Sequence, residues 1–319
     1  MRGYVPVPGD ALTLARVETI WDDAERAALV ALLRDRPDDL TWLQIMDEVD
    51  ARSSALTFWR HTHPPNLLDD GSGAPELADA ARDIAQWQVD GLGFMTFLDE
   101  DYPAQLRAIR DLPPVLFHRG RLVPDEVAMS VVGSRNASDR GLSIARSIAA
   151  GLVDRGIAVV SGLARGIDTA AHTVALEAGG RAVAVIGTGI NKYYPAENRP
   201  LQERIAAEGL VLSQFWPDAP PSRSTFPMRN TIMSGYGRAT IVVEAGEKSG
   251  ARIQANRAVA HGRPVVLTDL VVTVNKWAQN LVDKPGVHVA ESTADVMRIV
   301  DGIKADHLRF RSSLTTTAW

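Results

Sequence analysis

The stretch VAMSVVGSRNASDRGLSIARSIAAGLVDRGIAVV, residues 127–160, decides the fold of this chain. It opens with an apolar run at 127–132, which ends at Gly133 and predicts a buried strand. Residues 142–155 then place apolar side chains at helical spacing and end at Gly156, and 157–160 form a second apolar run. A buried strand, a helix and another buried strand in this order predict a βαβ unit with parallel strands.

The same alternation continues toward the C-terminus. Further strands are predicted at 182–186, 210–212, 239–243 and 265–267, and further helices at 167–178, 201–207 and 251–260. Strands that are apolar along their whole length are buried on both faces. The sequence therefore predicts the α/β class, with a Rossmann-like parallel sheet that has helices on both faces.

The N-terminal part of the chain has a different pattern. Helices are predicted at 18–34, 40–49 and 76–89, and the segment 63–76 is a loop rich in Pro, Gly and Asp. We therefore expect a small helical domain that precedes the sheet. The predicted parts are an acidic N-terminal domain at 1–90, a connecting segment at 91–125, the Rossmann-like domain at 126–305 and an irregular tail at 306–319.

Charge is distributed unevenly along the 319 residues, although the net charge is only −5. Residues 1–126 carry 12 Lys and Arg against 23 Asp and Glu, whereas residues 127–263 carry 16 against 10. A basic middle favours an anion site there, but an excess of this size is equally ordinary surface variation.

The composition also excludes several classes of function. The absence of cysteine excludes disulfides, thiolate catalysis and cysteine-ligated zinc. No apolar run has the length of a membrane span or of a signal peptide. We expect a cytoplasmic protein that does not associate with a membrane.

Ligands of open parallel sheets bind beyond the carboxyl ends of the strands, where this chain places small residues and arginines. Gly133, Ser134 and Arg135 follow the strand at 127–132 and precede a helix. Glycine and serine allow an anion to approach the backbone, the first turn of a helix offers N–H groups, and an arginine fork suits phosphate. An ordinary turn with Arg135 in solvent would give the same sequence.

A second segment repeats these components, and a third carries an arginine. Ser161, Gly162 and Arg165 lie between the strand at 157–160 and the next helix, and Arg229 lies in FPMRN at 226–230, which opens a helical segment. One such segment would be unremarkable. Three arginines that converge on one edge of the sheet would form a phosphate-binding surface, and we predict that Arg135, Arg165 and Arg229 do so.

Other polar and aromatic residues allow more than one interpretation. Tyr193 and Tyr194 could stack on bases or cover the edge of the sheet. Asp168 is predicted to cap the helix at 167–178 and to form a structural pair with His172. Glu244 is a lone carboxylate at a strand end. The sequence holds no GxGxxG fingerprint, P-loop or paired acid and base, so we expect a binding protein without a cofactor or a metal.

Taken together, five segments resemble the DNA-processing protein A (DprA/Smf) family in order and spacing. They are VVGSRNASDRG at 131–141, SGLARGIDTAAH at 161–172, AVIGTGINKYYPAEN at 184–198, FPMRN at 226–230 and VVEAGEKSGA at 242–251. The preceding DEDYPAQLRAIRDLPPVLFHRG at 99–120 is similar to the segment that leads into the Rossmann-like domain of that family. The similarity covers roughly residues 90–268.

The resemblance implies a bacterial protein that binds single-stranded DNA, forms a homodimer and hands DNA to the recombinase RecA during natural transformation. By motif, it implies that the phosphate contacts come from Gly133, Ser134, Arg135, Ser161, Gly162 and Arg165. Lys192, Arg229, Asn230 and Gly250 fall in the remaining family segments and are predicted to contact DNA. None of these residues is expected to be catalytic.

The chain also departs from the family pattern. Arg229-Asn230-Thr231 stands where the family usually has Arg-Asn-Arg, so one expected cation is absent. Two alternative functions stay open: a defence-associated relative, or a nucleotide sensor or phosphoribohydrolase-like enzyme of the same superfamily, although the Pro-Gly-Gly-x-Gly-Thr segment of such enzymes is missing. We expect the acidic N-terminal domain to contact protein or to shield the DNA site.

Overall fold

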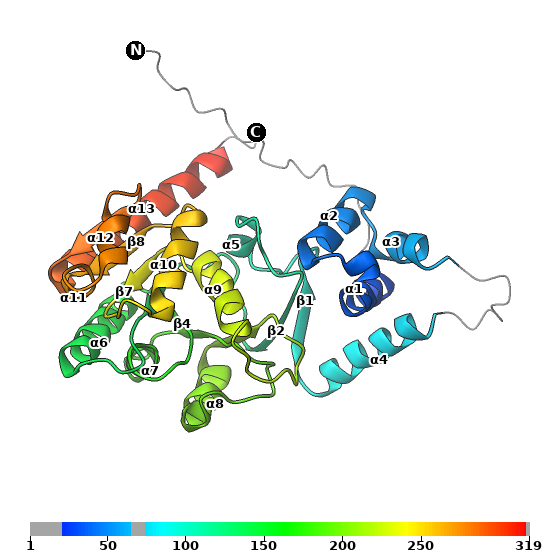
Figure 1. Ribbon diagram of the computed structural model, residues 1–319, viewed down its shortest axis with the longest axis horizontal. Coiled ribbons are helices and arrows are strands. Elements are labelled where there is room, and N and C mark those ends of the chain that lie inside the picture. The colour runs from blue at the N-terminus through cyan, green and yellow to red at the C-terminus, as the bar shows by residue number, and fades with distance from the viewer. Residues whose placement is uncertain (1–20, 65–73, 317–319) are drawn as a thin grey trace, which may run out of the picture. The chain divides into compact units, whose positions relative to one another are not determined.

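The computed structural model describes residues 21–64 and 74–316, and the chain divides into two compact units between Ala85 and Gln86. The expected start of the first helix at 18–20 and most of the expected loop at 63–76 lie outside the described residues. Figure 1 shows the helices of the first unit and the sheet of the second.

The N-terminal unit is helical, as predicted. Its elements are α1 (Asp23–Asp35), η1 (Pro37–Asp39), α2 (Trp42–Arg52), α3 (Ala55–Thr62) and the first part of α4 (Pro75–Val89). Asp22 caps α1 by accepting hydrogen bonds from the backbone of Ala24 and Glu25, and Thr41 forms a capping box with Gln44 at the start of α2. The helix α3 was not predicted from the sequence.

The second unit is built on one nine-stranded sheet with the order β1-β2-β6-β5-β4-β3-β7-β8-β9. In this order, the seven strands that begin with β6 and end with β9 are parallel to one another. β2 pairs antiparallel with β6, and β1 pairs antiparallel with β2 at the edge of the sheet. The strands are β1 (Gly93–Thr96), β2 (Val115–Gly120), β3 (Ala128–Val132), β4 (Ala158–Ser161), β5 (Ala182–Val185), β6 (Leu210–Ser213), β7 (Thr240–Val242), β8 (Val265–Thr268) and β9 (Val287–Ala290).

Helices cover both faces of the sheet, as predicted. From β3 the chain adds β4, β5 and β6 on one side, and it then crosses back to add β7, β8 and β9 on the other side of β3. Because crossover connections are right-handed, the helices of these two halves lie on opposite faces of the sheet (Figure 1). One face carries α6 (Asp139–Val153), α7 (Ile167–Glu177), η2 (Ala196–Asn198), α8 (Arg199–Glu208) and, against α6, α13 (Thr293–Thr316). The other carries α9 (Thr225–Tyr236), α10 (Gly250–Ala260), α11 (Asp269–Val272) and α12 (Lys276–Val282). The short α5 (Ala104–Arg107) packs against α9.

Hydroxyl side chains tie neighbouring strands together where the strands end. Ser161 of β4 donates to the Val131 carbonyl of β3 at 2.6 Å, and Thr268 of β8 donates to the Val243 carbonyl after β7 at 2.6 Å. Both hydroxyls are buried, so each needs such a partner. These bonds hold the carboxyl edge of the sheet, from which the loops of the candidate site emerge.

Two expectations about the ends of this unit were wrong. The segment at 91–125 was expected only to connect domains, but it contributes β1, α5 and β2, and its two strands belong to the sheet. The tail expected from residue 306 is helical as far as it is described, because α13 continues to Thr316. The edge strand β9 was also not predicted.

Candidate functional site

A pocket opens beyond the carboxyl ends of the central strands. It is lined by Arg135, Gly162, Ala164, Arg165, Tyr194, Pro195, Phe226 and Arg229. These residues come from the loops after β3, β4 and β5 and from the start of α9. The structure therefore brings the three arginines singled out in the sequence into one pocket.

The mouth of the pocket combines a cation with aromatic rings. Arg135 is exposed, and its guanidinium carbon lies 5.4 Å from the centre of the Phe226 ring. The ring of Tyr194 lies 5.4 Å from that of Phe226 at an angle of 44° and is 41% exposed. An arginine over one ring and a second ring beside it can hold both a phosphate and a flat base.

Arg229 forms the floor of the pocket and is only 6% exposed. Its Nη1 donates to the Val185 carbonyl at 2.8 Å, and its Nε donates to Asn230 Oδ1 at 3.1 Å. Burial lowers the pKa of this arginine to about 10, which leaves it charged at neutral pH. Gly162 makes this placement possible, since a Cβ there would overlap the guanidinium group.

Asp168 supplies the buried negative charge that faces Arg229. Its carboxylate accepts hydrogen bonds from the backbone N–H groups of Gly162 at 3.1 Å and Ala164 at 3.3 Å, and burial raises its pKa. The predicted capping role was wrong, because the N-cap of α7 is Gly166 and Asp168 bonds the loop before the helix. Gly166 has φ 76° and lies against the Ser134 carbonyl, so a side chain would not fit there.

Two further cations at this edge are paired with exposed carboxylates. Arg165 Nε lies 3.5 Å from Glu197 Oε1, and Lys192 Nζ lies 3.0 Å from Asp218 Oδ1. All four side chains are more than 40% exposed. Such surface pairs contribute about 0–1 kcal/mol, so a bound phosphate can compete for both cations. Of the two, only Arg165 lines the pocket.

The other residues predicted to contact DNA do not line the pocket. Ser161 is fully buried, and its hydroxyl donates a hydrogen bond to the Val131 carbonyl, so it supports the pocket from below. Asn230 is also buried, and its amide reaches the Gly250 carbonyl at 3.5 Å. Gly133 and Ser134 instead lie beside Glu244, where the Ser134 N–H donates to the Glu244 carbonyl at 2.7 Å.

Glu244 follows β7, which neighbours β3 at the topological switch point of the sheet. Its carboxylate accepts from the backbone N–H of Ser138 at 3.1 Å and from the Ser138 hydroxyl at 2.6 Å, and Gly141 leaves room for it. The start of α6 was expected to offer its N–H groups to an anion, but the Glu244 carboxylate already occupies that position. The pocket with the three arginines lies instead over the neighbouring ends of β4 and β5.

His172 lies in the core and does not line the pocket. It is fully buried in α7, and its Nε2 lies 3.2 Å from the Val183 carbonyl. Asp168 bonds different groups, so the two side chains do not form the predicted pair. Burial lowers the pKa of His172 to about 4, so the ring is neutral at physiological pH.

Sequence reasoning identified the arginines of the pocket more readily than its other walls. Phe226 was quoted only as part of its segment, Pro195 was not singled out, and stacking by Tyr194 was one of two equal interpretations. An aromatic residue that opens a helix beside arginine-bearing loops is the signal that could have identified Phe226.

Within residues 21–64 and 74–316, no three His, Asp or Glu side chains gather as metal ligands. No helix in those ranges is long and apolar enough to cross a membrane.

Comparison with known proteins gives one consistent result. Residues 93–301 match the family described as DNA recombination-mediator protein A. The chain is 45% identical over 177 residues to protein Smf of Synechocystis sp., which covers 54% of this chain and 44% of that protein. It is 43% identical over 171 residues to DNA processing protein DprA of Streptococcus pneumoniae, which covers 53% of this chain and 60% of that protein. The chain thus spans about half the length of these relatives.

Solved structures agree with the sequence relatives. The structure of DNA processing protein A from Streptococcus pneumoniae superposes with a TM-score of 0.65 at 29% identity, over 86% of this chain and 95% of that one. A structure of DNA processing protein A from Helicobacter pylori, which concerns its single-stranded DNA binding mode, gives a TM-score of 0.57 at 21% identity. That match covers 65% of this chain and 95% of the other and shows a shared fold.

Proposed function

The chain belongs to the DNA recombination-mediator protein A family, and from that premise we propose that it binds single-stranded DNA without catalysing a reaction on it. The observation that carries the proposal is the pocket in which Arg135, Arg165 and Arg229 meet the rings of Phe226 and Tyr194. The Helicobacter pylori relative is described as a binder of single-stranded DNA, which supports the same ligand here.

The chemistry of the pocket favours a single strand over a duplex. Phosphates are attracted to both arginines at the mouth. Arg229 forms the floor beneath them, with Asp168 as its buried counter-charge. Phe226 and Tyr194 offer ring faces on which an unpaired base can stack. In a duplex the bases are already paired and stacked, so a duplex can use only the arginines. We propose that Lys192, on the loop after β5, contacts the backbone of the strand outside the pocket.

The experiment that tests this proposal compares two arginines of equal charge. Arg135→Ala removes one of the two arginines at the mouth, whereas Arg146→Ala removes an exposed arginine of α6 that is not in the pocket. Fluorescence anisotropy measures the affinity of both variants for labelled oligothymidine at several salt concentrations. We expect Arg135→Ala to weaken binding and to reduce the salt slope by about 0.7 in log–log units, the value for one phosphate contact on a single strand. Equal effects of the two variants would refute the proposed pocket.

The stacking component needs its own variant. Phe226→Ala should weaken binding by about 1–3 kcal/mol, the usual contribution of one base on an aromatic ring, and should leave the salt slope unchanged. A change in the salt slope with unchanged affinity would contradict the role assigned to Phe226.

Transfer of the bound strand to RecA, action in transformation or recombination, and assembly as a homodimer are further proposals, which rest on the family. Sedimentation of the full chain tests the dimer. RecA filament formation on oligothymidine with and without this chain tests the transfer, and an unchanged rate of filament formation would contradict it.

The alternative of a phosphoribohydrolase-like enzyme is tested by the role of Glu244. In this structure its carboxylate is hydrogen-bonded to Ser138 and secures the start of α6. Incubation with nucleoside monophosphates should release no free base. Release of base that is lost in Glu244→Gln would contradict the non-catalytic proposal.

A further inference from the structure

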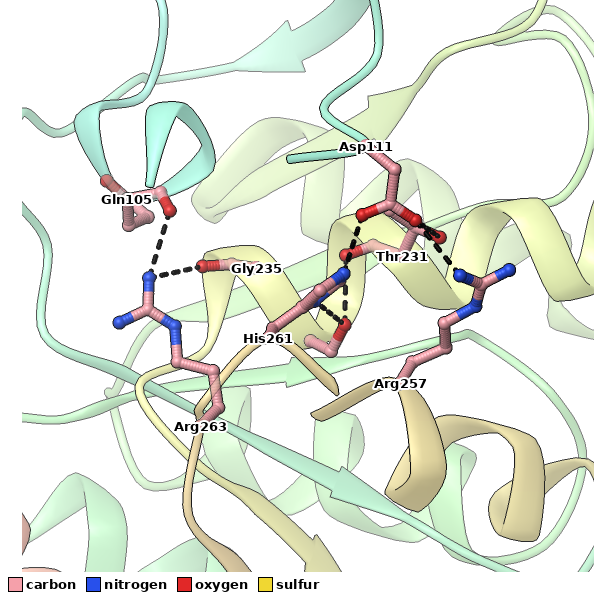
Figure 2. A network of polar contacts seen from close by, with 8 residues as sticks. Gln105, Asp111, Thr231, Gly235, Arg257, His261 and Arg263 are labelled. Carbon is pink, nitrogen blue, oxygen red and sulfur yellow. Dashed lines mark hydrogen bonds and ion pairs between the residues drawn. The ribbon is translucent and has the colours of Figure 1, made fainter. Parts of the chain in front are cut away.

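A second polar cluster lies at the other end of α9 from Phe226 and Arg229, and Figure 2 shows how its side chains meet. His261, directly after α10, places Nε2 2.7 Å from Asp111 Oδ1 and Nδ1 2.8 Å from Ser234 Oγ. Asp111 comes from the segment between α5 and β2, and Ser234 from α9. We call these three residues the α9 bridge. It joins segments that are 27 to 150 residues apart in sequence.

Asp, His and Ser in hydrogen-bonded order also form the triad of many hydrolases. Here the serine is only 1% exposed, and its hydroxyl lies 3.1 Å from the Thr231 carbonyl, to which it can donate. A buried hydroxyl cannot reach a substrate in this conformation. The α9 bridge is therefore a structural connection, and the hydrogen bond from His261 lowers the pKa of Asp111, which keeps the carboxylate charged.

The C-terminal half of α9 is fixed on two sides by this connection and its surroundings. Gly235 packs so closely on the segment before β2 that a Cβ there would lie 2.6 Å from Ile109 and 2.9 Å from Leu106. Arg263 donates to the backbone carbonyl of Gln105 at 3.1 Å and reaches that of Gly235 at 3.5 Å (Figure 2). The segment that holds Gln105 and Asp111 thus braces α9.

The N-terminal half of the same helix carries the pocket. Phe226 and Arg229 lie in its first two turns, and Ser234 lies in the third. Phe226 and Ser234 lie in one continuous helix of 12 residues, so a shift of its C-terminal attachment would be carried along the helix toward the Phe226 ring beside Arg135. Binding sites lose affinity when the residues that support them let the contacting groups shift by about 1 Å.

We propose that Asp111 and His261 are positioning residues for the DNA pocket and act through α9 on Phe226 and Arg229. This inference rests on the proposed single-stranded DNA binding. Asp111→Asn keeps the shape of the side chain but removes the charge that receives the His261 hydrogen bond. Arg257→Ala is the matched control, because Arg257 touches the other oxygen of the same carboxylate at 3.1 Å from a half-exposed position.

The test measures the DNA affinity of each variant and base stacking in the pocket as well as the stability of the fold. Oligothymidine that carries one 2-aminopurine reports base stacking by its fluorescence at saturating protein, and Phe226→Ala supplies the signal of lost stacking. We expect Asp111→Asn to bind about five- to tenfold more weakly, within the range of one lost stacking contact, and to shift the saturated signal toward that of Phe226→Ala. Arg257→Ala should match the wild type in both measurements.

The outcomes separate the inference from the proposal beneath it. Asp111→Asn that is less stable but binds with unchanged affinity and signal would show that the α9 bridge only stabilises the fold, which would overturn the inference. His261→Gln replaces Asp111→Asn if the latter does not fold, with the same expected result. Failure of the wild-type chain to bind oligothymidine would instead overturn the proposed function.

Discussion

Acid should destabilise the larger unit through one buried histidine, His172. Its ring is fully buried in α7, its Nε2 faces the Val183 carbonyl, and its Nδ1 has no hydrogen-bond partner among the described residues. Burial lowers the pKa from 6.5 to about 4 in the folded protein. Between these two values the unfolded chain binds a proton that the folded chain does not bind, so the free energy of unfolding decreases as the pH falls.

The size of the effect follows from the two pKa values. At pH 7.5 both states hold a neutral ring, and His172 makes almost no contribution. A solution pH of 5 is about 1.5 pH units below the pKa of histidine in the unfolded chain. Each pH unit corresponds to 1.36 kcal/mol, so the free energy of unfolding decreases by about 2 kcal/mol. His172→Gln removes this titration and keeps an amide that can face the Val183 carbonyl.

Urea unfolding at pH 7.5 and pH 5, followed by circular dichroism, measures the prediction. Other groups that titrate in this range contribute equally to both proteins and cancel in the difference. The stability of wild type relative to His172→Gln should fall by about 2 kcal/mol between the two pH values. His288→Gln, which removes an exposed histidine of β9, is the matched control for the loss of an imidazole. A pH-independent difference between wild type and His172→Gln would refute the assignment.

Three further changes test individual features of the fold. Gly162→Ala should displace Arg229 from the Val185 carbonyl, which costs about 1–3 kcal/mol in urea unfolding and weakens oligothymidine binding. Gly166→Ala should cost on the order of 1–3 kcal/mol in the same assay, because its φ of 76° suits only glycine beside the Ser134 carbonyl. Ser249→Ala removes the cap that accepts from Ala251 N at 3.1 Å and should lower the free energy of unfolding by about 1 kcal/mol. Wild-type stability in any of these variants would contradict the feature concerned.

The central strands could be predicted because their signal is local. The apolar runs at 127–132, 157–160 and 182–186 end at glycine or serine, and the observed β3, β4 and β5 fall within a residue of them. Every residue of these three strands is buried, which is why the runs contain almost no polar side chain.

The edge of the sheet depends on distant partners and was missed for that reason. β2 pairs with β6 through contacts such as Phe117 with Ser213, and no local pattern reveals such a partner. β9 is an edge strand with His288 and Val289 exposed, so it lacks the continuous apolar run of a buried strand. The helix α13 is fixed by Val296 and Val300 and then propagates through a polar stretch that resembles a tail.

The candidate site could be located from the sequence but not built from it. Strand ends, glycines and arginines indicated the right edge of the sheet. The burial of Arg229 depends on the missing side chain of Gly162 and on the charge of Asp168, which lie more than 60 residues earlier in the chain. The occupation of the switch point by Glu244 likewise depends on its long-range bond to Ser138.

The most direct test of the central claim is an anisotropy titration of labelled oligothymidine and of a matched duplex at two salt concentrations. The pocket of arginines and aromatic rings predicts tighter binding of the single strand, with an affinity that falls steeply as salt increases. No binding of oligothymidine at low salt, or equal binding of both DNA forms, would contradict the account.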